Sequence, residues 1–422
     1  MYEERVIMPL FLSNSANLNT NALANKFHHL DRIEKERCRQ ATKNSNDPFS
    51  MSIAINRASI NYNRYSDIIP FNYNRIKLLQ QRPNKTDYIN ASYIEAPNNV
   101  RRYIATQGPL KETIEDFWLM IWEKETHIIV MLTNQIERGE IKCETYWPKE
   151  IGNYTMFKDI GLKVTLESEI LDSKATCYER TFKLEKLRGR DIITESRQIT
   201  QLQTIAWPDH GVPDSPDPIN NLIIKMNERM QHCNRNSGPI VVHCSAGCGR
   251  TGTFCTVDST LALLPGLQQN DSTDLIFNVV QHFRQQRISM VQNLAQYQFC
   301  YLTVLSKLVS DYERPQSSDP LQSDPPSSFS PVYCAHDNPP PVSPNQPGLR
   351  CKKRAWTKEE DHALLDSIIV ELSGRWSSIC SRNELLIQRG PSMASQRFKS
   401  SIKHKLLSGE NSKRPRLKDD EE

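Results

Sequence analysis

Apolar positions recur along the chain, up to about residue 312, with two different periods. A spacing of three to four residues predicts helices over 24–40, 112–125, 217–236, 253–264, 272–287 and 294–311. Alternating or continuous apolar runs predict strands over 87–94, 128–132 and 240–243, and several more within 161–206. Strands and helices that follow one another in this way indicate a domain of the α/β class, which we place at 24–312.

The pattern changes outside this domain. Residues 1–23 are rich in Asn and have weak periodicity, so we expect a disordered N-terminal segment. Residues 313–349 hold 10 of the 25 prolines and predict a Pro/Ser-rich linker, either a bare spacer or a docking site for SH3- or WW-type domains. Helical spacing returns over 350–407 and predicts a small all-α three-helix domain, which a charged tail follows at 408–422.

The sequence argues against a membrane-spanning protein and against a secreted one. With 422 residues the chain is long enough for two or three domains, but no apolar run approaches the ~18 residues of a membrane span. The opening residues do not read as a secretory signal, so we expect no membrane partner. The 11 cysteines are scattered without a CxxC pair, which predicts neither a disulfide framework nor a zinc site. We therefore expect a reducing location, the nucleus and/or the cytoplasm.

The net charge of +4 is distributed unevenly. Residues 350–418 hold 16 Lys and Arg against 7 Asp and Glu, so the rest of the chain is mildly acidic. A basic module on an acidic body indicates a separate polyanion-binding role for the C-terminal region.

The most informative stretch is IVVHCSAGCGRTG, residues 240–252. A buried strand, a Gly-bearing loop and a helix start together make an anion cradle, because backbone N–H groups converge there and the helix N-terminus adds partial positive charge. A thiol of ordinary pKa, about 8.5, is mostly protonated at neutral pH, but this setting favours the thiolate of Cys244. Arg250 can fold back and bind two oxygens of a tetrahedral anion. The alternative is a buried cysteine beside a Gly-rich turn, and the flanking motif residues favour chemistry.

HCSAGCGRTG, residues 243–252, resembles the phosphate loop of the cysteine-dependent, phosphotyrosine-specific protein tyrosine phosphatases. The resemblance extends over residues 25–312 and implies their fold, a twisted mixed sheet flanked by helices. Its other landmarks are the NxxRY loop around Asn63–Tyr65, IATQGPL at 104–110, IERGEIK with Glu137 and Lys142, WPDHGVP at 207–213 and MVQNLAQYQF at 290–299.

The resemblance implies a catalytic role for five residues and no cofactor or metal. Cys244 is the nucleophile, Arg250 binds the phosphate, and Asp209 first protonates the leaving phenolate and then activates water. Gln292 positions that water, and the Thr251 hydroxyl bonds to the departing sulfur.

A second set of residues is implied in substrate binding. Tyr65 forms a wall of the cleft, although an ordinary loop aromatic is the alternative, and Asp67 holds the substrate peptide backbone. Glu137 braces Arg250 and Lys142 lines the cleft, against the alternative of a solvated charged turn. Gln296 lies near Gln292. The phosphate enters an amide ring made by Ser245, Ala246, Gly247, Cys248 and Gly249.

The resulting hypothesis is an active phosphatase whose substrates are phosphotyrosine-containing proteins. A domain that captures phosphotyrosine without turnover is one alternative. Dual specificity toward phosphoserine is another, but the complete Tyr65 loop argues for a cleft too deep for shorter side chains.

The C-terminal module resembles a Myb/SANT-like helix-turn-helix repeat through RAWTKEEDHALL, GRWSSI and RF, with Trp356, Trp376 and Phe398 as its aromatic core. Its third helix places basic residues on one polar side, which favours binding to DNA or chromatin. A small basic protein-binding bundle is the alternative. KRPRLK at 413–418 resembles a nuclear import signal. The basic residues of the third helix are Arg397, Lys399, Lys403 and Lys405.

Overall fold

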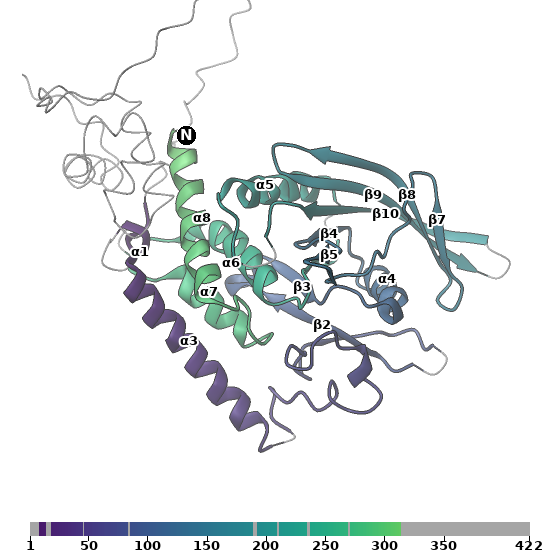
Figure 1. Ribbon diagram of the computed structural model, residues 1–422, viewed down its shortest axis with the longest axis horizontal. Coiled ribbons are helices and arrows are strands. Elements are labelled where there is room, and N and C mark those ends of the chain that lie inside the picture. Colours follow the sequence, from purple (N-terminus) through teal and green to yellow (C-terminus); the bar gives the residue numbers. More distant parts are fainter. Residues whose placement is uncertain are drawn as a thin grey trace, which may run out of the picture.

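The structure is a computed structural model that describes residues 8–13, 18–44, 46–82, 85–188, 192–208, 211–233, 237–268 and 271–313. Within this part of the chain a mixed sheet forms the centre, and helices cover both of its faces (Figure 1). The predicted α/β class, with a mixed sheet flanked by helices, is confirmed. The predicted linker beyond residue 313, the predicted Myb/SANT-like module with its basic third helix, and the predicted charged tail lie outside the described residues.

Nine strands form the large sheet in the order β1-β2-β3-β11-β4-β10-β9-β8-β7 within the described residues. The four strands β3, β11, β4 and β10 are parallel, and every other neighbouring pair is antiparallel. The bounds are β1 Arg75–Lys77, β2 Tyr88–Glu95, β3 Arg102–Thr106, β4 Ile128–Met131, β7 Tyr154–Phe157, β8 Leu162–Asp172, β9 Cys177–Arg188, β10 Ile192–Thr204 and β11 Ile240–His243. A separate hairpin pairs β5 Ile136–Glu137 with β6 Glu140–Ile141.

The other regular elements of the described residues are helices. The α-helices are α1 Leu10–Ser13, α3 Thr20–Ala41, α4 Ile114–Glu123, α5 Asp217–Gln231, α6 Gly249–Leu263, α7 Leu275–Arg284 and α8 Leu294–Glu313. Short 3₁₀ turns are η1 Ile60–Tyr62, η2 Pro97–Asn99, η3 Lys111–Thr113 and η4 Leu264–Gly266. Helix α6 begins four residues before the predicted start, because the Gly-rich sequence hides its first turn from an apolar pattern. Arg250 therefore lies on the first turn of α6.

Strand β11 has buried side chains on both faces, as its apolar sequence predicts. Val242 packs into the cluster formed with α3, α5, α6, α7 and α8, whereas Val241 packs with α4 on the opposite face. Alternate residues of a strand point to opposite faces, so a central parallel strand must be apolar throughout. This double burial holds the end of β11, and the loop that follows it, in a rigid position.

The prediction of a disordered segment over residues 1–23 is wrong for residues 8–13 and 18–23. Phe11, Leu12 and Leu23 are between 1% and 3% exposed and belong to the main core. Asn19 caps α3, because its side chain accepts a hydrogen bond from the Ala22 N–H at 2.8 Å. An Asn-rich sequence lacks apolar periodicity, but a single asparagine in this position starts a helix.

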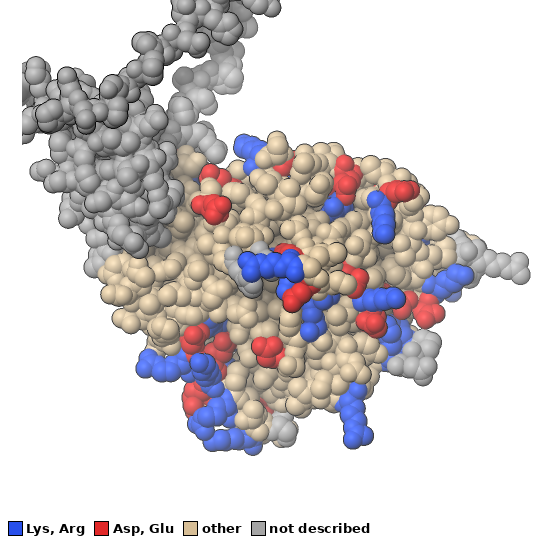
Figure 2. All heavy atoms as spheres, in the orientation of Figure 1, with Lys and Arg blue, Asp and Glu red and all other residues tan. Residues whose placement is uncertain are grey.

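Charge of one sign does not gather on the face of the domain that Figure 2 shows. Lys and Arg side chains are interspersed with Asp and Glu on the face that Figure 2 shows. Among the described helices, none combines the length and the apolar character needed to cross a lipid bilayer. The functional site must therefore be located from its geometry.

Candidate active site

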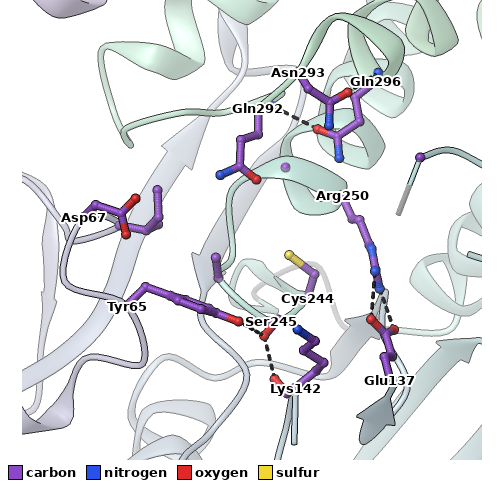
Figure 3. Close-up of a pocket in the computed structure, with 14 residues that line it drawn as sticks. Tyr65, Asp67, Glu137, Lys142, Cys244, Ser245, Arg250, Gln292, Asn293 and Gln296 are labelled. Atoms are coloured by element: carbon purple, nitrogen blue, oxygen red, sulfur yellow. Dashed lines mark hydrogen bonds and ion pairs between the residues drawn. The ribbon is translucent and has the colours of Figure 1, made fainter. Parts of the chain in front are cut away.

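A cavity of about 300 Å³ opens at the end of β11, where five distant parts of the chain meet (Figure 3). Its lining residues are Tyr65, Asp67, Ile68, Glu137, Lys142, Gly211, Cys244, Ser245, Ala246, Gly249, Arg250, Gln292, Asn293 and Gln296. Among the described residues with a predicted role, only Gly247, Cys248 and Thr251 do not line it. The structure thus brings together residues that lie far apart in the sequence.

The loop after β11 curves around the sulfur of Cys244. The Gly247 N–H donates a hydrogen bond to Cys244 Sγ at 3.2 Å, and Cys244 is 5% exposed, with its sulfur directed into the cavity (Figure 3). Gly247 has φ +74°, and a Cβ there would lie 2.1 Å from the Thr106 carbonyl oxygen. Only glycine allows this turn. Because the turn points an amide at the sulfur, it stabilises negative charge on Cys244.

Arg287 holds the outer side of the same loop. Its guanidinium is fully buried and donates hydrogen bonds to the carbonyl oxygens of Gly247, at 2.7 Å, and Ala246, at 3.1 Å. It also reaches Asn90 Oδ1 at 2.8 Å, which ties the loop to strand β2. Since these carbonyls are bound outside the loop, the amides are left to face inward, toward the cavity.

Arg250 is fixed in place by Glu137 of strand β5. Its Nη1 and Nη2 donate to Glu137 Oε1 and Oε2 at 2.7 and 2.9 Å, a bidentate pair, and Nη1 also reaches the Leu132 carbonyl at 3.2 Å. Glu137 is itself held by Thr133, whose hydroxyl donates to Oε1 at 2.8 Å. Because one edge of the guanidinium is bound, the side chain is pre-organised to present its charge to an anion above Cys244.

Tyr65 stands on the opposite side of the cavity. Ser245 Oγ donates to the Lys142 carbonyl at 2.9 Å, so the Tyr65 hydroxyl is the donor in its own 2.9 Å contact with Ser245 Oγ. The neighbouring Arg64 donates to the carbonyls of Gly108 and Pro109 at 3.0 and 2.7 Å. These bonds make the Tyr65 ring a rigid wall beside the loop that follows β11.

His243 is buried directly before the nucleophile candidate. Its Nδ1 lies 3.1 Å from the Cys244 carbonyl oxygen and its Nε2 lies 2.9 Å from the Tyr146 hydroxyl. The Gln201 amide donates to that hydroxyl at 2.6 Å, so the hydroxyl proton is directed to Nε2 and the imidazole proton lies on Nδ1. Burial lowers the pKa of His243 to about 4, with added repulsion from Arg64. The ring is therefore neutral at pH 7 and orients the Cys244 backbone.

Two other cysteines lie close to the loop without lining the cavity. Cys143 follows Lys142 in the chain, and Cys248 is the N-cap of α6. Burial raises the pKa of both thiols, so both stay protonated at neutral pH. Cys244 is the cysteine that the cavity exposes to a ligand among the described residues. This distinguishes the candidate nucleophile from its neighbours.

Gln292 lies above Cys244, where the MVQNLAQYQF segment at 290–299, here called the glutamine loop, enters helix α8 (Figure 3). The Gln292 N–H donates to Gln296 Oε1 at 2.9 Å, and both side chains line the cavity. The Thr251 hydroxyl is fully buried and has no hydrogen-bond partner among the described residues, so its predicted bond to the sulfur is not formed in this state. An unsatisfied buried hydroxyl is available to a sulfur that gains charge.

The predicted acid loop is described only at its two ends. Trp207 is buried at 2% exposure, and its Nε1 donates to the Gly211 carbonyl at 3.3 Å. Gly211 lines the cavity. Asp209 lies between them and is outside the described residues.

A model of the protein-tyrosine phosphatase family matches residues 59–306, which is more than half of the chain. The chain belongs to the protein-tyrosine phosphatase family. This match includes the five segments that supply cavity residues in the phosphatase fold described above. The predicted family resemblance of residues 25–312 is thereby confirmed for the matched residues.

Curated relatives agree with this membership. Receptor-type tyrosine-protein phosphatase C of Homo sapiens is 41% identical over 239 residues, 56% of this chain and 17% of the relative. Receptor-type tyrosine-protein phosphatase V of Rattus norvegicus is 39% identical over 259 residues, which are 61% of this chain and 14% of the relative. Tyrosine-protein phosphatase non-receptor type 12 of Homo sapiens is 39% identical over 247 residues, which are 58% of this chain and 30% of the relative. The chain thus spans less than a third of the length of each of these relatives.

Sequence reasoning missed several residues of this candidate site. Asn293, Ile68 and Gly211 line the cavity, and Arg287 braces its loop. Gly211 belongs to the quoted WPDHGVP motif and Asn293 to the quoted glutamine loop, so those two were within reach of the motifs. Arg287 had no such signal, because its partners are main-chain carbonyls 40 and 41 positions away.

Proposed function

We propose that this chain hydrolyses phosphotyrosine in proteins through a cysteinyl-phosphate intermediate. The observation that supports it best is the pairing of Cys244 with Arg250 across one cavity. The sulfur accepts a backbone N–H at 3.2 Å, and the guanidinium is aligned by two hydrogen bonds to Glu137. A nucleophile and an anion clamp that line the same cavity are what transfer of a phosphoryl group requires. The printed names of the relatives describe tyrosine-protein phosphatases.

In the first step the Cys244 thiolate attacks phosphorus as the bond to the tyrosine oxygen breaks. Asp209 protonates that oxygen, so neutral tyrosine leaves. The loop amides and Arg250 stabilise the charge on the three non-bridging oxygens.

In the second step a water oxygen attacks phosphorus, the phosphorus–sulfur bond breaks and inorganic phosphate forms. The Asp209 carboxylate takes the water proton, Gln292 orients the water, and the Thr251 hydroxyl hydrogen-bonds the sulfur as it regains its charge.

Phosphotyrosine rather than phosphoserine is the expected substrate. Tyr65 is held upright by its bond to Ser245, so a phosphate must pass this wall before it reaches the loop. An aryl group spans that depth, and the short serine side chain does not. We expect kcat/KM for a phosphotyrosyl peptide to exceed that for the matched phosphoseryl peptide by about 10³-fold or more.

The measurement is phosphate release from one peptide sequence synthesised with either residue. Comparable rates would support dual specificity instead. Tight binding of the phosphotyrosyl peptide with no release would support the capture alternative. Wild-type rates must exceed those of Cys244→Ser, because this comparison excludes phosphate release by contaminating phosphatases.

We further propose that the C-terminal module binds DNA or chromatin. Support comes from the sequence, in which the predicted third helix presents Arg397, Lys399, Lys403 and Lys405 to phosphates. In a gel shift, the full chain is expected to retard duplex DNA at low salt. The retardation is expected to disappear as the salt concentration rises. A variant with these four residues changed to glutamine is expected to bind more weakly. No shift at low salt would reject DNA binding and favour a protein-binding bundle.

A further inference from the structure

The loop that presents Gln292 is held in an unfavourable backbone conformation. Ser289 has φ +57° and Val291 has φ +61°, which is the left-handed region that β-branched residues rarely occupy. Val291 is also pressed against the start of α6, since a Cβ on Gly252 would lie 2.3 Å from the Val291 nitrogen. Such a conformation persists only when surrounding contacts impose it.

Arg284 supplies part of that restraint. Its Nε donates to the Met290 carbonyl at 3.0 Å and its Nη2 to the Val291 carbonyl at 2.8 Å. The residue is 2% exposed, so these bonds are shielded from water. The guanidinium also stacks over Phe27, with 5.1 Å to the ring centroid. The two carbonyls that precede Gln292 are therefore fixed by one side chain.

Helix α3 supplies further restraint on this loop, through two carboxylates on one face of the helix. Asp31 Oδ1 lies 2.7 Å from Arg284 Nη1. Glu34, 8% exposed, accepts the Ser289 N–H at 2.9 Å and lies 3.7 Å from the same Arg284 nitrogen. Helix α3, Thr20–Ala41, precedes the segment that the family model matches, and it packs against α7 and α8 (Figure 1).

We propose that Glu34 is a positioning residue for the hydrolysis of the phosphoenzyme. It holds the Ser289 amide, and with it the strained loop, so that Gln292 stays over Cys244. This inference rests on the proposed function. The step that depends on it is attack of water on the cysteinyl phosphate, in which the phosphorus–sulfur bond breaks and Asp209 takes the proton. Formation of that intermediate uses the loop amides, Arg250 and Asp209. The hydrogen bond and the ion pair given for Glu34 among the described residues go to Ser289 and Arg284 instead.

The test separates the two half-reactions with p-nitrophenyl phosphate in rapid-mixing experiments. Glu34→Ala removes the acceptor of the Ser289 amide. We expect kcat to fall about tenfold and KM to fall in proportion, with kcat/KM unchanged and a burst of p-nitrophenol equal to the active-site concentration. Slower hydrolysis lets the phosphoenzyme accumulate, which is why the burst and the lower KM appear together.

Two further variants serve as controls for this experiment. Glu34→Gln keeps an acceptor oxygen for the Ser289 amide and is expected to retain kcat within about twofold. Glu36→Ala, two positions away on the exposed side of the same helix, removes exposed contacts with Arg39 and Gln40 and is expected to behave as wild type. Rates are divided by the burst amplitude, so an unfolded fraction does not mimic the effect.

Three results would overturn the proposal. The first is an unchanged kcat in Glu34→Ala. The second is a Glu34→Ala enzyme in which kcat and kcat/KM, both calculated per active site, fall by the same factor. The third is a fall of kcat in Glu34→Gln as large as that in Glu34→Ala. The proposed function fails in a different way, because then wild type would release no more p-nitrophenol than Cys244→Ser, and both claims would be lost.

Discussion

Cys244→Ser is expected to lower kcat for a phosphotyrosyl peptide by about 10⁵-fold or more, while the affinity for that peptide changes only a few-fold. Serine lacks an anion at neutral pH, so no covalent intermediate forms. The cradle remains, because Arg250 is held by Glu137 and the loop by Arg287, independently of the sulfur. Substrate therefore still binds without being turned over.

The measurement pairs phosphate release with fluorescence polarisation of a labelled phosphotyrosyl peptide. Cys38→Ser, a half-buried cysteine of helix α3, is the matched control and should leave both quantities near wild type. Residual turnover above one part in about 100 would remove Cys244 from the role of nucleophile. Loss of binding together with turnover would mean that the loop had collapsed.

Arg250→Lys is expected to lower kcat by about 10³-fold and to weaken vanadate binding by about 10²-fold. Lysine keeps the positive charge but has a single ammonium group. It cannot bind both oxygens of Glu137 and also present two parallel N–H groups to a tetrahedral anion. The loss arises from geometry, since the charge at the site is unchanged.

Arg102→Lys, on the exposed end of β3, is the control for a generic Arg-to-Lys change. It should leave kcat and vanadate binding near wild type, with the rates measured on the same phosphotyrosyl peptide. An Arg250→Lys enzyme with more than about a tenth of wild-type kcat would show that a point charge suffices. Bidentate recognition would then be unnecessary.

Local sequence patterns were sufficient for the phosphate loop. A strand that is apolar on both faces, glycines and a helix start follow one another within 240–252, so the chain order itself places Cys244 in a ring of amides. Only the helix start was displaced, at Gly249 rather than at residue 253. The Asn-rich start was misjudged because packing of Phe11 and Leu23 on the core leaves little periodic signal.

Contacts between distant residues could not be read from such patterns. Glu137 and Arg250 are 113 positions apart, and Asp31 and Arg284 are 253 apart. The motif resemblance anticipated the first pair, but nothing in the sequence indicated the second. The left-handed conformation of Val291 is likewise a result of packing, because valine by itself disfavours it.

The sequence by itself determined the residues on which the proposed chemistry depends: a cysteine and an arginine six positions apart in a glycine-rich strand-to-helix loop. The tertiary structure decided which side chains hold that chemistry in place. The reason is physical. A loop's amides are organised by its own backbone, whereas a buried ion pair or a braced carbonyl exists only after the sheet has brought separate segments together.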